Sequence, residues 1–426
     1  MMTPSSASVR TDDLVICPAC QTIHRRIPLE QGMRARCQHC GTILYRNDPY
    51  YLNRTLALTM TGMILFLAAN LFPLVQIDLF GHAQYVTILH AIGQLAVNGY
   101  VLVAVAVGVL VLAIPAVVMG AYAVVLMLLR MRRGKRATQA LLKLLAYLLP
   151  WSMVDVFSVS ILVALVKLTG EVTIHLGASF WALVAYVGID FYLTKANRLG
   201  YLWRVFDRVH GGRRPDILEG VGVRCRVCEA VNPDRGGNEQ CRRCGARLHP
   251  TAAVSLRRAW AFLLTALILY LPANFYPILE IKNVFYRGGN TIVGGIIQLW
   301  DQGSYIVAAI ILVSSVFIPI LKFILLSYIY LSVHHPVAAT KTARHRLHAI
   351  VEVIGPWSMI DVFVVSILTG LVTYEQFRIV AGPGATLYVL MVFFTMLSAW
   401  SFDPRLIPSK SRQQEEDPCV LPPRPT

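Results

Sequence analysis

The feature that most constrains this chain is a long internal duplication. PWSMVDVFSVSIL at residues 150–162 returns as PWSMIDVFVVSIL at residues 356–368, and LAANLFPLVQI at 67–77 returns as LPANFYPILEI at 271–281. A group of four cysteines precedes each copy, and all three landmarks are about 205 residues apart. Solenoid repeats have periods of roughly 20–50 residues. A repeat this long instead indicates a membrane protein built from two similar halves.

Composition and charge agree with a membrane location. Of the 426 residues, 56% are hydrophobic and only 15% are charged, against about 25% charged residues in soluble proteins. The apolar residues form long blocks, as membrane spans do. The net charge of +16 comes from Lys and Arg that gather between those blocks, at 130–136, 195–214 and 341–346. Basic loops of this kind are typical of the cytoplasmic side, so the charge favours membrane topology over nucleic-acid binding.

We expect eight spans, four in each half. Asn70 and Pro73 predict a broken or kinked last turn in the first span, and Pro115 falls inside the second, with Pro319 at the corresponding place. The link at 78–99 contains no Lys or Arg, which places it on the periplasmic side with its counterpart at 283–304. The expected spans are 55–77, 100–129, 141–168, 178–194, 256–281, 305–331, 347–371 and 387–400.

The sequence therefore predicts an all-α polytopic membrane protein with two tandem four-helix transmembrane units, each preceded by a small cytoplasmic zinc ribbon. Both halves begin in the cytoplasm, so they are parallel and any pseudo-twofold axis lies along the membrane normal. The first apolar run follows a complete cysteine group rather than a signal peptide. The expected domains are a disordered N-terminus 1–13, ribbon 14–48, transmembrane unit 49–205, ribbon 206–250, transmembrane unit 251–404 and disordered tail 405–426.

Each cysteine group consists of two CxxC pairs. Two such pairs bring four thiolates into a tetrahedron around one Zn²⁺, and Gly41 and Gly245 suit the tight turn after the second pair. On the reducing cytoplasmic side, CxxC pairs indicate metal sites rather than disulfides. We predict two Zn²⁺ per chain, with iron in a rubredoxin-like site as the alternative. The predicted ligands are Cys17, Cys20, Cys37 and Cys40 in the first ribbon, and Cys225, Cys228, Cys241 and Cys244 in the second.

The predicted metal sites have a structural role. A filled four-cysteine site has no open coordination position, and ribbons of about 35 residues need the metal to fold. Because each ribbon is joined to a membrane bundle, we expect it to serve packing, assembly or regulation.

Several polar residues fall inside the predicted spans. Asp155 and Asp361 occupy the same place in the two copies of PWSMxDVF, and Lys322 lies mid-span where the first half has Val118. A charge inside the membrane is costly and marks a candidate functional site. The alternative is a carboxylate that only holds helices together, with Ser152 or Ser358 as partner. Asp190, at the end of a span, is expected to be interfacial. Asn70 with Pro73, and Asn274 with Pro277, are expected to cap the freed carbonyls of broken helix ends.

The chain contains no P-loop, His-Glu-x-x-His or G-x-S-x-G motif, so we do not expect an enzyme. The two CxxC ribbons, each leading into a unit with PWSMxDVF and ANxxP motifs, resemble the paraquat-inducible protein A family, which includes the LetA-type proteins. The resemblance covers residues 14–407.

That resemblance implies a multi-pass inner-membrane protein of double-membraned bacteria. It implies an MCE-domain partner, which forms a tunnel for phospholipid across the periplasm, and a bundle that loads or receives lipid at the inner-membrane end. It also implies a polar network coupled to protons, to which we match Asp155, Asp361 and Lys322. The alternatives are a zinc-bearing membrane scaffold or sensor of envelope stress, with the ribbons as the working part, and an efflux protein for small cations.

Overall fold

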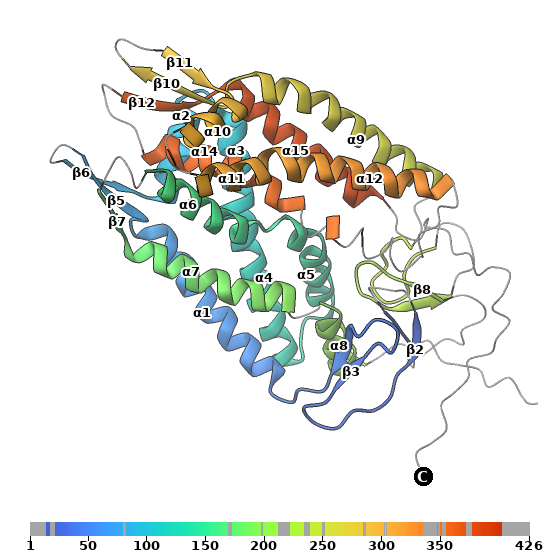
Figure 1. The fold of residues 1–426 in the computed structure, drawn as a ribbon. Helices are drawn as coiled ribbons and strands as arrows, with labels where there is room; N and C mark the ends of the chain where they lie inside the picture. Colours follow the sequence, from blue (N-terminus) through green and yellow to red (C-terminus); the bar gives the residue numbers. More distant parts are fainter. Residues whose placement is uncertain are drawn as a thin grey trace, which may run out of the picture.

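The computed structural model describes residues 14–17, 22–79, 82–168, 173–196, 199–211, 222–233, 239–248, 252–283, 287–301, 303, 305–334, 347, 350–351, 355–371 and 377–402. The predicted disordered ends, Cys20 and the basic segment 341–346 lie outside these residues. The chain is predominantly helical, and its two halves place equivalent elements in the same order (Figure 1).

The first half begins with the ribbon strands β1 (Leu14–Ile16), β2 (Ile23–Arg25), β3 (Arg34–Arg36) and β4 (Ile43–Arg46). The bundle follows with α1 (Tyr51–Leu71), β5 (Val75–Leu79), β6 (His82–Val86), α2 (Ile88–Val97), α3 (Val101–Val107), the π-helix η2 (Gly108–Ala113), α4 (Ile114–Met131), α5 (Lys135–Leu148), the 3₁₀ turn η3 (Leu149–Trp151), α6 (Val154–Leu168), β7 (Thr173–Leu176), α7 (Ala178–Phe191), the π-helix η4 (Tyr192–Ala196) and α8 (Leu199–His210).

The second half repeats this plan. Its elements are β8 (Gly222–Arg224), β9 (Val231–Pro233), α9 (Ala252–Phe275), β10 (Leu279–Asn283), β11 (Arg287–Asn290), α10 (Ile292–Asp301), α11 (Tyr305–Leu312), the π-helix η5 (Val313–Phe317), α12 (Ile318–His334), the 3₁₀ turn η6 (Gly355–Met359), α14 (Ile360–Leu371), β12 (Phe377–Ala381) and α15 (Pro383–Ser401).

Six helical segments of the described chain are long and apolar enough to cross a membrane. They are Tyr51–Leu71, Val101–Met131, Lys135–Val166, Val254–Phe275, Ala308–Val333 and Pro383–Ser401. The predicted fourth and seventh spans correspond to the shorter apolar helices Ala178–Thr194 and Gly355–Gly370. The protein is therefore a multi-pass membrane protein, and the count of eight spans stays a prediction.

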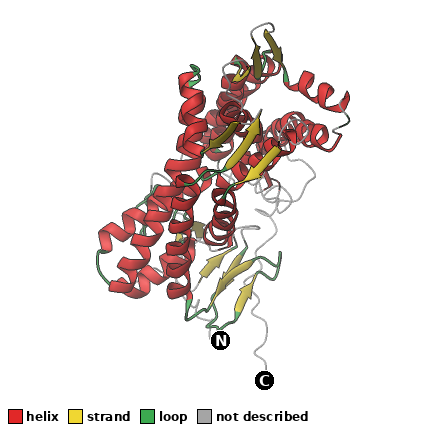
Figure 2. Cartoon of the chain, turned by 90° about the vertical axis from the view of Figure 1, so that its left-hand side faces the viewer, coloured by secondary structure: helices red, strands yellow, loops and turns green. Residues whose placement is uncertain are grey.

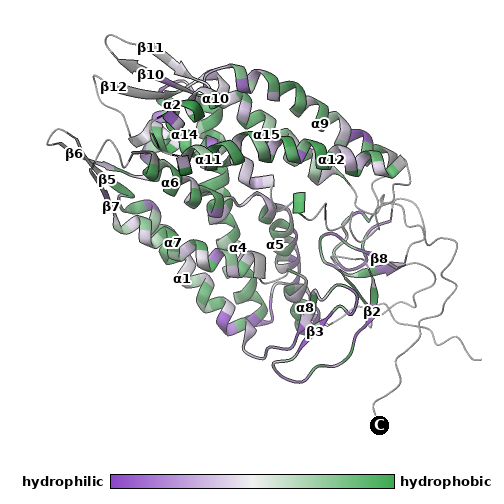
Figure 3. Cartoon of the chain, in the orientation of Figure 1, coloured by the Kyte–Doolittle hydropathy of each residue, from purple (hydrophilic) through white to green (hydrophobic). Residues whose placement is uncertain are grey.

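The helices consist mainly of hydrophobic residues, whereas the ribbons are more hydrophilic (Figure 3). Ile64 on α1 is 67% exposed, and Ile268 on α9 is 70% exposed. Large exposed apolar side chains on several helices need a lipid environment rather than water. This surface agrees with the membrane location.

A proline shapes the long second helix of each half. Ile114, just before Pro115, donates its N–H to the carbonyl of Val109, and Ile318, just before Pro319, donates to Val313. Both bonds span five residues, as in a π-helix. Because proline lacks an N–H and its ring crowds the preceding turn, the widened turn lets the helix continue past it. The corresponding prolines thus produce corresponding π segments.

The third expected span is not one continuous helix. Pro150 lies in the 3₁₀ turn between α5 and α6, and Ser152 and Met153 are not helical. The same break occurs in the seventh expected span, where η6 precedes α14. Asp155 falls within the membrane-span segment Lys135–Val166, in the first turn of α6 after the break, and Asp361 is in the first turn of α14.

The bundle also contains β-structure, so the all-α prediction was incomplete. The links between helices form two antiparallel sheets, β6-β5-β7 and β11-β10-β12, one in each half. The sheets lie at one end of the helices and the ribbons at the other (Figure 1). Figure 2, seen from the side of the sheets, shows the strands of the two sheets and of the ribbons in yellow against the mainly helical body. We call these the sheet end and the ribbon end.

The two halves pack through equivalent helices. Within each half, the first helix packs along the last, α1 on α7 and α9 on α15. Between the halves, α6 packs on α14, so the two copies of the duplicated motif meet at the centre of the bundle. A single hydrophobic core extends through both halves.

Candidate metal centres and buried polar network

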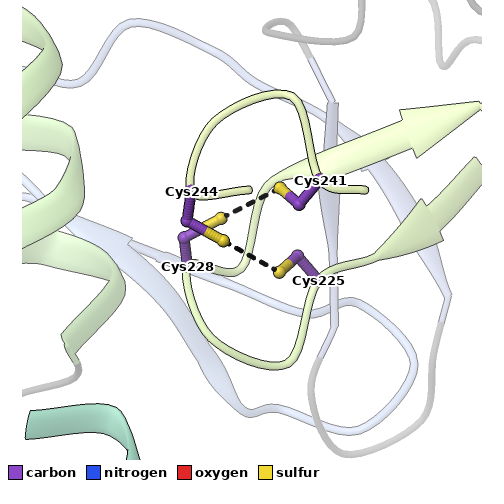
Figure 4. Close-up of side chains that lie close together, drawn as sticks. All are labelled: Cys225, Cys228, Cys241 and Cys244. Atoms are coloured by element: carbon purple, nitrogen blue, oxygen red, sulfur yellow. Dashed lines mark hydrogen bonds between the residues drawn. The ribbon is translucent and has the colours of Figure 1, made fainter. Parts of the chain in front are cut away.

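The second cysteine group forms a compact four-sulfur cluster. The thiols of Cys225, Cys228, Cys241 and Cys244 point toward one another from two knuckles (Figure 4). All four are buried, and their sulfurs lie within 4.8 Å of one another. The Cys225–Cys244 and Cys228–Cys241 sulfurs are 3.6 and 3.5 Å apart. A tetrahedral zinc with Zn–S bonds of about 2.3 Å requires S···S distances of about 3.8 Å. The donor set therefore fits a tetrahedral metal.

The knuckles close in the way the glycine positions predicted. The N–H of Gly41 donates to the carbonyl of Cys37 at 2.8 Å, and Gly245 donates to Cys241 at 2.7 Å. Both glycines have positive φ, 72° and 71°, which glycine adopts without steric cost. Glu229 holds the same place after Cys228, with φ 61°, and its carboxylate pairs with Arg224 at 2.5 Å.

In the first ribbon the structure describes three of the four predicted ligands. Cys17, Cys37 and Cys40 lie within the same 4.8 Å limit, and the Cys17 and Cys40 sulfurs are 3.4 Å apart. Hydrogen bonding to Thr42 lowers the pKa of Cys40 to about 6, which favours the thiolate that binds metal. Nε2 of His24 lies 3.1 Å from the Cys37 sulfur. The described cysteines form no disulfide in either ribbon.

The two ribbons differ in how they join the bundle. The second-ribbon cysteines belong to the main hydrophobic core, whereas Cys17 and Cys37 belong to a small separate core. Three contacts fix the second ribbon: Arg243 with Asp207 on α8, Gln139 on α5 with the Arg243 carbonyl at 3.2 Å, and Arg226 with the Phe402 carbonyl at 2.5 Å. Phe402 follows α15, so this ribbon joins the first half to the second.

In the second half, Lys322 is buried inside the bundle. It is 3% exposed, and its Nζ donates to Oγ1 of Thr395 on α15 at 2.7 Å. Thr395 in turn donates to the Val392 carbonyl. A Cβ at Gly355 in η6 would lie 3.5 Å from Nζ, so the amine faces the helix break. The described hydrogen-bond partner of Lys322 is therefore a hydroxyl and not a carboxylate.

Other polar residues of this half lie in or next to the same helix break. Ser358 donates to the Gly355 carbonyl at 2.8 Å. The Tyr388 hydroxyl donates to the Ser315 carbonyl in the π segment at 3.4 Å, and it lies beside the Asp361 carboxylate. Of the predicted site residues, the structure thus brings Lys322, Ser358 and Asp361 together around η6. The sequence analysis missed Thr395 and Tyr388, because their proximity to Lys322 and Asp361 is visible only once the helices are packed together.

The first half has the same break with different chemistry. Asp155 is half-buried and accepts the N–H of Val156 at 3.0 Å, which suits a carboxylate at a helix N-terminus. The buried Ser152 hydroxyl has no hydrogen-bond partner among the described residues. Val118 replaces Lys322, and Asp190 occupies the place of Thr395, 205 residues earlier. Asp190 is only 5% exposed, so its side chain is buried within the bundle, and its expected place at the membrane interface stays a prediction.

The two asparagines behave alike at their helix ends. Nδ2 of Asn70 donates to the Phe66 carbonyl at 2.7 Å, and Nδ2 of Asn274 donates to Tyr270 at 2.8 Å. After α1 ends at Leu71, the Pro73 carbonyl reaches Gly177 at the start of α7, and Pro277 reaches Gly382 in the same way. The ANxxP motifs thus sit where the first and last helices of each half meet.

These features define a duplicated multi-pass membrane protein with two cysteine ribbons. A family model described as paraquat-inducible protein A matches residues 52–207 and 256–410. The chain is 31% identical over 415 residues to the intermembrane transport protein PqiA of Escherichia coli, covering 95% of this chain and 97% of the relative. This chain belongs to the paraquat-inducible protein A family.

Two further relatives cover nearly the whole chain. A probable intermembrane transport protein of Haemophilus influenzae is 27% identical, covering 92% of this chain and 94% of its own length. The lipophilic envelope-spanning tunnel protein A of Escherichia coli is 28% identical, covering 92% and 90%. No solved structure matches the chain. All three relatives are named as transport or tunnel proteins, which is consistent with a protein that is not an enzyme.

Proposed function

We propose that this protein is the inner-membrane component of an intermembrane lipid-transport system. It loads or receives phospholipid at the inner-membrane end of a periplasm-spanning tunnel formed by an MCE-domain partner. The names of the relatives support intermembrane transport, and the multi-pass bundle supports a component that is embedded in the membrane. The phospholipid cargo and the MCE partner follow from the family resemblance.

We further propose that the ribbon end and both termini face the cytoplasm. The supporting features are the reduced cysteines and the basic turn at Arg130 and Arg132, which agree with the positive-inside rule. The test is cysteine substitution at Gly81 and Gly288, with a membrane-impermeant reagent applied to intact spheroplasts. Both should be labelled, and a cysteine at Gly134 should not. Labelling of Gly134 alone would show the opposite orientation.

Each ribbon is proposed to hold one structural Zn²⁺, two per chain. Four thiolates in the second ribbon and three described ones in the first are the donor set zinc prefers. Elemental analysis of the purified protein should give two zinc per chain. Iron in place of zinc would support the rubredoxin-like alternative, and an absence of metal would reject both.

The observation that carries the transport mechanism is the buried amine of Lys322 at a broken helix. The amine lies beside η6, the turn that leads to Asp361. Its partner Thr395 is on α15, and the same helix carries Tyr388, which lies beside Asp361. We propose that this network, with Asp155 in the other half, changes hydrogen-bond partners as a proton arrives. Such an exchange biases the bundle between lipid-accepting and lipid-releasing shapes. The alternative is a permanent network that only holds helices together.

Substitution of the network separates the two interpretations. Lys322→Ala, Asp155→Asn and Asp361→Asn should each abolish envelope function in vivo, while the protein still inserts and still binds its partner. Asp301→Asn, at an exposed position at the end of α10, is the matched control and should keep function. Loss of the three variants from the membrane would support the permanent network, and normal function of all three would reject the proton switch.

A second function, a zinc-bearing membrane scaffold or sensor, has one observation in its favour. The second ribbon contacts α5 and α8 of the first half and the end of α15. In that case, ribbon variants alone should fail at normal protein levels while the network variants keep function.

A further inference from the structure

A cavity with a strongly basic lining lies at the ribbon end of the bundle. Its volume is about 1060 Å³, and its walls come from the first ribbon, α5, α8 and the second ribbon. Among the described residues, seven Arg or Lys side chains line it, together with two carboxylates, Asp207 and Glu229. Apolar side chains of the first ribbon, including Leu14, Leu29 and Leu44, form part of the same wall. The cavity has the size of a small-molecule site.

Both carboxylates of the cavity already have basic partners. Asp207 pairs with Arg243, and Glu229 pairs with Arg224. Arg26 and Arg204 form no ion pair within the described residues. The protein itself therefore leaves positive charge in the cavity uncompensated by described carboxylates.

The two guanidinium groups without ion pairs converge on one aromatic ring. Cζ of Arg26, from the first ribbon, lies 5.4 Å from the ring centroid of Tyr45, and Cζ of Arg204, from α8, lies 5.8 Å from the same centroid. Arg204 also lies over Tyr201, at 5.5 Å. Burial, and then the charge of Arg26, lower the pKa of Arg204 to about 10. The two positive charges repel each other, and an anion bound beside them would offset this repulsion.

We propose that this cavity is a binding site for a phosphate ester, with Arg26 and Arg204 as its guanidinium ligands. Guanidinium forks match phosphate oxygens in pairs, and such charge-assisted bonds are the strong ones. Both guanidinium groups contact the Tyr45 ring and Arg204 also contacts Tyr201, which restrains the side chains and reduces the ordering cost on binding. The apolar wall suits an ester with a small hydrocarbon part. The ester has two sources, a phospholipid headgroup at the membrane surface or a soluble phosphate metabolite.

The test uses purified full-length protein with its metal, at about 0.15 M salt where weak surface attraction is screened. Binding of two probes, glycerol 3-phosphate and dioctanoyl phosphatidylglycerol, is measured by titration. At least one should bind, and Arg26→Gln with Arg204→Gln should weaken it by about tenfold or more. The soluble source predicts that glycerol 3-phosphate binds as tightly as the lipid, and the headgroup source predicts binding of the lipid alone.

The matched control is Arg25→Gln. Arg25 is exposed on β2 next to Arg26 but does not line the cavity, so its loss removes the same charge and should leave binding unchanged. The probe should also raise the unfolding temperature of the wild type but not of the double variant. Arg26→Gln alone, at an exposed position, keeps the test valid if the double variant folds poorly. No binding of either probe, or equal weakening by Arg25→Gln, would overturn the proposal.

Discussion

Phe157 and Phe363 stand at the same place in the two copies of the duplicated motif, and they pack edge to face with ring centroids 5.5 Å apart. A residue contacts its own counterpart only where the axis that relates the halves passes between them. The axis therefore runs through the α6–α14 contact. Asp155 and Asp361, each two residues before the phenylalanine of its half, lie within one turn of this contact, so a change at one carboxylate is close to its counterpart in the other half.

The two metal sites should differ in their effect on the bundle. Cys228→Ser opens the site that shares the main hydrophobic core, so we expect the unfolding temperature of the whole protein to fall by on the order of 10 °C. Cys37→Ser affects a separate core and should lower it much less. Thermal unfolding in detergent, with elemental analysis of each variant, measures this. Equal effects would contradict the difference in packing.

Gly177 should not tolerate a side chain. A Cβ there would lie 2.1 Å from the carbonyl oxygen of Pro73, which is backbone and cannot turn aside. We expect Gly177→Ala to destabilise the protein by about 1–3 kcal/mol, as overpacking does. Gly188, later in the same helix, has no atom within 4 Å of an added Cβ, so Gly188→Ala should be neutral or stabilising by up to about 1 kcal/mol. Chemical denaturation of both variants tests the contrast.

Gly370 should be required where α14 of the second half crosses α2 of the first. A Cβ at Gly370 would lie 2.5 Å from Cβ and 2.6 Å from Cα of Ala91. Gly370→Ala should therefore lower stability, and Ala91→Gly should recover only part of the loss because the Cα overlap remains. A double-mutant cycle measures this coupling. Gly93→Ala, on α2 with open space around it, is the control, and an equal loss there would reject the explanation.

Thr395 should matter through its hydroxyl. Thr395→Val keeps the shape but removes the oxygen that accepts from Lys322, which leaves a buried amine unsatisfied at a cost of about 1–3 kcal/mol. Thr395→Ser keeps the oxygen and should retain most of the stability and envelope function. Comparison of membrane abundance and function in the two variants measures the role of this bond. Normal behaviour of Thr395→Val would show that Lys322 has another partner.

The duplication and the motifs predicted much of this architecture. Equivalent apolar blocks in the sequence correspond to equivalent helices in the structure. The described cysteines of each CxxC group lie close together, as their spacing predicted. The helix breaks were missed because an apolar run looks the same whether one helix or two half-helices carry it. The sheets were missed because their strands are short and continue directly from apolar helices. Thr395, and its correspondence with Asp190, could have been noticed only by aligning the last helices of the halves, since a threonine in a span has no distinctive pattern.

The π-helix at Val313–Phe317 has a consequence for the residues beyond it. A π turn carries one residue more than an α turn, and one residue of an α-helix corresponds to about 100° of rotation and 1.5 Å of rise. Lys322 follows this turn on the same helix. If the surplus residue passed along α12, Lys322 would swing about 100° around the helix axis, away from Thr395. The part of α12 beyond the π turn would then have two positions, which differ by this rotation and rise and are set by where the extra residue lies.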